Sequence, residues 1–130
     1  MKSTPLLAIA LISTASVAGP ETDFPHRNWG KIATLDMSVA DASACIARAM
    51  DREGSVLVLP VDGGNDIDFS PGGLFGTTTN EPILRYKVRA DGSVSTMQLF
   101  YRHPVSQKLA GRYVEKLQKR CLKVRQIDAA

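Results

Sequence analysis

Residues 84–100 read LRYKVRADGSVSTMQLF, and this stretch decides the fold. Apolar and polar residues alternate on both sides of Asp91-Gly92, a dipeptide that favours a two-residue type I′ turn between antiparallel strands. A turn centred on this dipeptide pairs Ala90 with Ser93. Because side chains alternate across a strand, one face of the hairpin is apolar and buried. The opposite face, called the open face below, carries the six residues of a candidate binding face: Arg85, Lys87, Arg89, Thr96, Gln98 and Phe100.

The register of this hairpin predicts two cross-strand pairs. Leu84 lies opposite Leu99 on the buried face, and Glu81 lies opposite Arg102, which gives an opposite-charge pair across the strands. A slip of one residue would move the charges of the open face into the core. The assignment of the two faces is therefore well constrained.

Two amphipathic helices are predicted on either side of the hairpin. In the first, over residues 39–53, Ser38 is the N-cap, and an apolar stripe follows at helical spacing: Val39, Ala42, Cys45, Ile46, Ala49 and Met50. The second follows Pro104, with His103 or Ser106 as its cap. Its apolar stripe recurs every four residues: Leu109, Tyr113, Leu117 and Cys121.

The remaining segments complete the predicted fold. Ser55 to Leu59 (SVLVL) is a third strand, Lys31 to Leu35 is compatible with a further short one, and residues 61–80 form a long loop rich in Gly, Asp, Thr and Pro. The sequence therefore predicts an α+β fold with about three antiparallel strands and two helices packed on one face. The expected order is helix, strand, long loop, hairpin, helix.

The N-terminus has the pattern of a secretory signal peptide. Lys2 provides a positive n-region, LLAIALI at residues 6–12 is a short apolar h-region, and small residues precede a cut after Ala18. We therefore expect a cleaved signal peptide at 1–18, a tether at 19–30, one domain at 31–125 and a tail at 126–130. The expected location is the periplasm or the outside of the cell.

Export to an oxidising compartment would allow the two cysteines to form a disulfide. An exported chain with only Cys45 and Cys121 is expected to pair them in one disulfide. Since both cysteines lie on apolar helix stripes, the bond would join the two helices. A redox pair or a zinc site is a poorer interpretation, because the chain has no C-x-x-C and no clustered histidines.

The composition excludes several classes of protein but does not identify a function. The chain has 130 residues, 44% hydrophobic and 22% charged, which excludes collagen-like, disordered and repeat-built proteins. Residues 81–130 hold eleven of the sixteen Lys and Arg side chains. Five lie on the outer side of the second helix: Lys108, Arg112, Lys116, Lys119 and Arg120. A basic surface of this kind fits an anionic envelope component or a protein partner, or is simply solvated.

Three segments contain residue types that chemical sites use. The loop contains Asp62, Asn65, Asp66 and Asp68, but an EF-hand starting at Asp66 fails because Pro71 and Thr77 stand where Gly and Glu are needed. A calcium loop of another kind stays an alternative to a solvated acidic turn. The Gly-rich run at 71–76 has no P-loop ending. His103 could serve a small hydrolase, but no nucleophile and orienting acid accompany it.

Two passages resemble the C-terminal domain of TonB-type energy-transducing proteins: residues 47–62 (ARAMDREGSVLVLPVD) and residues 84–121. The insert at 63–80 departs from that pattern, as does the absence of a membrane anchor and a proline-rich spacer. As a whole, the chain resembles small exported proteins of Gram-negative bacteria that have no assigned activity. The Tyr-Arg-His-Pro stretch at 101–104, with the basic helix after it, carries this second resemblance.

Together these patterns favour a small exported, non-enzymatic binding or envelope-associated module. An accessory or inhibitor protein that acts through the open face is the alternative, and a hydrolase that uses His103 is the third. We expect no catalytic residue, no metal, no cofactor, no nucleic-acid partner and no transmembrane segment.

Overall fold

The computed structural model describes residues 26–71 and 81–129. The predicted signal peptide, the first part of the predicted tether and the Gly-rich run from residue 72 onward lie outside these ranges.

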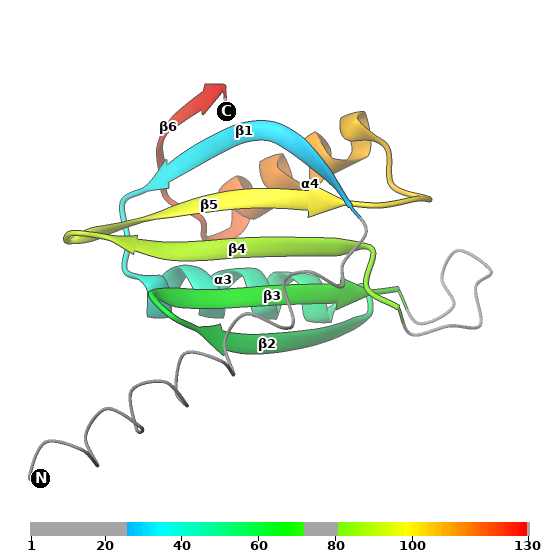
Figure 1. Ribbon diagram of the computed structural model, residues 1–130, viewed down its shortest axis with the longest axis horizontal. Helices are drawn as coiled ribbons and strands as arrows, with labels where there is room; N and C mark the ends of the chain where they lie inside the picture. The colour runs from blue at the N-terminus through cyan, green and yellow to red at the C-terminus, as the bar shows by residue number, and fades with distance from the viewer. Residues whose placement is uncertain (1–25, 72–80, 130) are drawn as a thin grey trace, which may run out of the picture.

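The described chain is one antiparallel sheet with two helices on one side of it (Figure 1). In chain order the elements are β1 (Arg27–Leu35), α3 (Val39–Asp51), β2 (Ser55–Val61), β3 (Gly64–Ser70), β4 (Leu84–Asp91), β5 (Val94–Tyr101), α4 (Gln107–Arg120) and β6 (Val124–Ala129). The strands are ordered β2-β3-β4-β5-β1-β6 across the sheet. The predicted α+β class, the two helices and their disulfide are confirmed, whereas the prediction of about three strands is wrong, because the sheet has six.

The strand β3 lies inside the segment that was predicted as a long loop. Its sequence, GNDIDFS, contains two Asp residues, and Asp is depleted in strands. Ile67 and Phe69 are nevertheless fully buried toward the helices, and Asp66 and Asp68 point to the open face. Apolar residues therefore alternate with carboxylates along β3, and both faces of the strand are buried.

The two strands β1 and β6 also extend beyond their predicted segments. β1 starts at Arg27, so residues 27–30 of the expected tether belong to the sheet. Residues 126–129 of the expected tail lie in β6, which pairs with β1. These segments are short and carry exposed polar residues, so their sequence does not predict a strand. They adopt the strand conformation because they pair with a neighbouring strand of the sheet.

The hairpin keeps its predicted faces but not its predicted register. Asp91 pairs with Val94, so Gly92 and Ser93 form the turn, and Leu84 pairs with Tyr101. Gly92 has a φ of +65°, and no described residue other than Gly has a positive φ. A type I′ turn would need a positive φ at both central positions, and the observed turn needs it only at Gly92.

This register differs from the predicted one by two residues on β5. Because side chains alternate with a period of two, each residue stays on its predicted face. Arg102 Nη2 lies 3.1 Å from Glu81 Oε1, so the predicted ion pair forms although the two residues are not directly opposite each other. A long side chain reaches a diagonal neighbour across the strands.

The helices begin where capping residues indicate. Ser38 accepts a hydrogen bond from Asp41 N at 3.1 Å, and Ser106 accepts one from Leu109 N at the same distance. Of the two predicted caps of α4, Ser106 is therefore the one used. The apolar stripes of both helices then pack on the sheet, where Tyr86, Met97 and Leu99 are fully buried.

One polar group lies deep in this core. The Tyr86 hydroxyl donates a hydrogen bond to Met50 Sδ at 3.4 Å. Burial raises the pKa of this phenol far above its ordinary value, and the nearby Tyr113 and Glu53 raise the pKa further. Tyr86 therefore stays neutral while the protein is folded.

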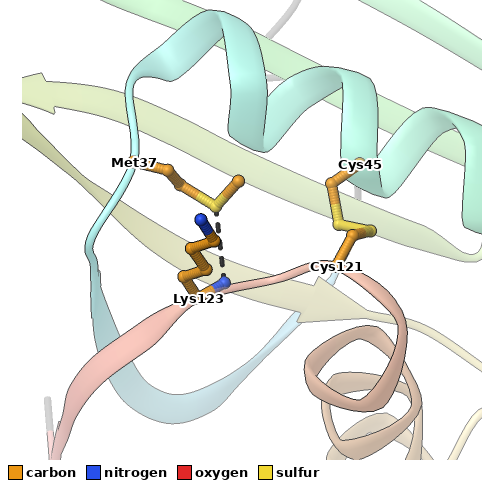
Figure 2. Close-up of a disulfide and its surroundings, with 4 residues drawn as sticks. All are labelled: Met37, Cys45, Cys121 and Lys123. Carbon is orange, nitrogen blue, oxygen red and sulfur yellow. Dashed lines mark hydrogen bonds between the residues drawn. A yellow bond between two sulfur atoms is a disulfide. The ribbon is translucent and has the colours of Figure 1, made fainter.

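The disulfide fixes the end of α4 against α3 (Figure 2). Cys45 lies in the middle of α3, and Cys121 is the C-cap of α4, with 5.8 Å between their Cα atoms. Immediately beyond the bond, Lys123 N donates to Met37 Sδ at 3.4 Å. Asp36 N also donates to Lys123 O at 2.7 Å. The bond therefore lies where the chain turns from α4 into β6.

Candidate functional site

The structure places all six predicted residues of the open face on the side of the sheet away from the helices. Arg85 pairs with Phe100, Lys87 with Gln98, and Arg89 with Thr96 in neighbouring strands. The pattern therefore gathered the right side chains on one face. Their surroundings differ from the solvated, basic surface that the sequence suggested.

The arginines of the open face bind the carboxylates of β3. Arg85 Nε and Nη2 donate to the two oxygens of Asp68 at 2.6 and 2.8 Å, and both side chains are buried. Arg89 Nη2 lies 2.8 Å from Asp66 Oδ1 in an ion pair. A bidentate, buried pair of this kind holds two strands in register. The positive charge of Arg85 and Arg89 is therefore balanced within the sheet.

The other cation of the open face lies against an aromatic ring. Lys87 Nζ is 5.0 Å from the centre of the Phe100 ring. His26 contacts the edge of the same ring, with 4.5 Å between the ring centres. Gln98 and Thr96 are half-buried beside this cluster. The open face is thus a packed network of mixed charge.

The acidic residues of the predicted loop do not form a metal site. Asn65 points to the helix side, where its Nδ2 donates to Ser43 Oγ at 2.9 Å. Asp66 and Asp68 point the other way, toward arginines. Within residues 26–71 and 81–129, no cluster of three or more His, Cys, Asp or Glu side chains could hold a metal ion.

His103 lies in a shallow depression of about 350 Å³ at the start of α4. Ser106, also in its wall, already caps α4 through its hydroxyl. The six lining residues include no carboxylate that would orient the imidazole: Arg27, Tyr101, His103, Val105, Ser106 and Gln107. This arrangement lacks the third member of a nucleophile–base–acid set.

A larger groove, called the α4 groove below, lies between α4 and the strands β1 and β6. Its volume is about 700 Å³. The residues that line it are Trp29, Lys31, Gln107, Lys108, Gly111, Arg112, Val114, Glu115, Gln118 and Ile127. Most of them share one side of α4, because they recur every three or four residues along the helix.

A bulge in β1 brings two residues to this groove. Asn28 pairs with Phe100 and Ile32 with Gln98, so three residues of β1 lie opposite the single residue between them on β5. At the centre of the bulge Gly30 has a φ of +85°, a conformation that favours glycine. Bulges of this type redirect side chains next to functional sites. Here the redirected neighbours of Gly30 are Trp29 and Lys31.

The α4 groove carries excess positive charge. Lys31, Lys108 and Arg112 are exposed, and no ion pair within the described part of the chain engages them. Glu115 is the one acidic residue in the wall. Lys31 Nζ lies 5.3 Å from the centre of the Trp29 ring, which leaves its ammonium at the mouth of the groove. Such a site attracts anions from solution.

Sequence reasoning placed Lys108 and Arg112 on the outer side of their helix but missed the groove. Two signals in the sequence point to it. Trp29 is the one tryptophan of the chain and was assigned to a tether, and Gly111 interrupts an otherwise regular helical pattern. An isolated glycine inside a helix usually has a packing or functional reason.

Comparisons with protein families, with curated proteins and with solved structures find no match to this chain. The resemblance to the TonB-type domain and to small exported proteins therefore stays untested. Neither helix in the described ranges is long and apolar enough to cross a membrane.

Proposed function

We propose that this protein is an exported binding module that holds an anionic ligand in the α4 groove. The observation that carries the proposal is the grouping of Lys31, Lys108 and Arg112 around one groove, where no ion pair within residues 26–71 and 81–129 engages them. A volume of about 700 Å³ is in the range of small-molecule sites, which run from about 300 to 1,000 Å³. An anionic component of the cell envelope fits both the charge and the expected location.

We place the ligand in the α4 groove and not on the open face for an electrostatic reason. Arg85 and Arg89 already bind Asp68 and Asp66, so an incoming anion would compete with carboxylates that are in place. Breaking such buried pairs is unfavourable. The cations of the α4 groove share its wall with Glu115, but no ion pair in the described chain engages them.

The export part of the proposal rests on the signal-peptide pattern at residues 1–18 and on the disulfide, which is compatible with an oxidising compartment. We expect the mature protein to begin at Gly19. The intact mass of protein recovered from the periplasm measures this directly. Folded periplasmic protein that still carries Met1 would contradict the prediction.

The binding part is tested by retention on immobilised dextran sulfate. Lys108→Gln combined with Arg112→Gln should release the protein at clearly lower salt, because two cations of the groove are lost. The matched control is Lys119→Gln combined with Arg120→Gln, which removes two exposed charges from the same helix outside the groove.

Both double variants lower the net charge equally, so a general charge effect moves both elution positions together. The proposal requires that the groove variant elutes earlier than the control. Dextran sulfate should also change the fluorescence of Trp29, the one tryptophan of the chain. Equal elution of the two variants, without a fluorescence change, would overturn the assignment of the groove.

A further inference from the structure

Gly111 lies in the interior of α4, where glycine is unfavourable. Relative to alanine, a glycine inside a helix lowers stability. A Cβ atom built on Gly111 would meet only Trp29 Nε1, at 3.5 Å, which is an ordinary van der Waals contact. Packing therefore does not require glycine here. A methyl group at position 111 would instead cover the indole nitrogen of Trp29.

Within the described residues, that nitrogen is a hydrogen-bond donor without a partner. Trp29 is 6% exposed, and its Nε1 forms no hydrogen bond with any described residue. Buried tryptophans usually satisfy this N–H group. The nitrogen is not sealed from water either, since the fully buried side-chain atoms without a partner in the described chain are both on Asp66. The gap at Gly111 therefore opens an unused donor into the α4 groove.

The remaining wall of the groove indicates what kind of anion fits. Next to Gly111 along α4 lie Lys108 and Arg112, which favour an oxyanion. Glu115 and the carboxamides of Gln107 and Gln118 also line the groove. A carboxylate repels a ligand that is anionic throughout, but it accepts hydrogen bonds from hydroxyl groups. The mixture fits a sugar that carries one oxyanion group better than a bare polyanion.

We propose that the α4 groove binds a saccharide with a phosphate or sulfate group, and that the Trp29 indole N–H donates to this group through the gap at Gly111. This inference rests on the proposed function, and it makes Gly111 and Trp29 the residues that determine specificity. A tetrahedral oxyanion suits the site because it offers three free oxygens to donors that approach from different sides. Lys108 and Arg112 supply positive charge, and the indole N–H supplies a hydrogen bond of defined direction.

The test follows the indole ¹H–¹⁵N resonance of Trp29 and measures affinity by calorimetry, with glucose 6-phosphate and glucose 6-sulfate as probes. The two probes separate phosphate from sulfate as the preferred group. Either probe should shift the resonance and bind more tightly than glucose or inorganic phosphate. If both probes bind no better than inorganic phosphate, the saccharide part is wrong.

Gly111→Ala provides the decisive variant. It should fold with an unchanged or higher melting temperature, because alanine favours the helix, yet bind the preferred probe about fivefold or more weakly. Trp29→Phe keeps an aromatic ring and removes the N–H, so it should weaken binding by a similar factor. Combining the two should weaken binding no further, because both remove the same hydrogen bond.

The outcomes separate this inference from the proposed function. If Gly111→Ala binds like the wild type while Lys108→Gln/Arg112→Gln binds poorly, the indole subsite is wrong and the groove stands. If neither variant changes binding, the groove itself is wrong.

Discussion

Reduction of the Cys45–Cys121 bond is expected to lower the free energy of unfolding by about 4–5 kcal/mol. The two cysteines are 76 positions apart, so the bond removes much of the freedom of the unfolded chain. In the folded protein it ties the end of α4 to the middle of α3 (Figure 2). A domain of this size buries about two thirds of the surface that its unfolded chain exposes, and a loss of this magnitude is a large part of its stability.

Denaturant unfolding with and without dithiothreitol measures this effect. The control is the Cys45→Ala/Cys121→Ala double variant, whose stability should not respond to the reductant. Comparison of the oxidised and reduced wild type isolates the bond, because no side-chain atom other than the thiol hydrogens changes. A difference below about 1 kcal/mol would mean that the unfolded chain is already compact without the bond.

The parts of the fold that sequence could predict are those with strong local patterns. Ser38 and the apolar stripe after it define α3, and the alternation around Gly92 defines the β4–β5 hairpin. The exact register was missed because Asp-Gly and Gly-Ser both allow a two-residue turn. The pairing of Asp91 with Val94, and the lack of a positive φ at Asp91, separate the two.

The strands that were missed depend on distant partners. Asp66 and Asp68 read as loop residues until Arg85 and Arg89 are placed beside them, about twenty residues further along the chain. Once those carboxylates are assigned to a strand, the open face is no longer strongly basic. The missed strand therefore also concealed the partners of the two arginines.

The α4 groove could not be predicted from the sequence for a similar reason. Trp29 and Gly111 come from β1 and α4, and both line the α4 groove because β1 lies between β5 and β6. Sequence spacing alone does not give this order of strands. The unusual residues were visible, but nothing local showed that they meet.

Leu99→Ala is expected to lower the free energy of unfolding by about 2–5 kcal/mol. Leu99 is fully buried, opposite Tyr86, in a strand that contacts both helices, so the shorter side chain leaves a cavity in the core. Denaturant titration at equilibrium measures the change. The size within this range depends on how far the neighbouring side chains can close the cavity.

The same substitution at Leu57 is the matched control. Leu57 lies in β2 at the edge of the sheet and is 56% exposed, so Leu57→Ala should lower the free energy of unfolding by less than about 1 kcal/mol. Both variants exchange leucine for alanine in a strand, and the difference between them therefore reports burial alone. Equal losses would contradict the assignment of Leu99 to the face that packs against the helices, because a residue on the open face has no core to leave.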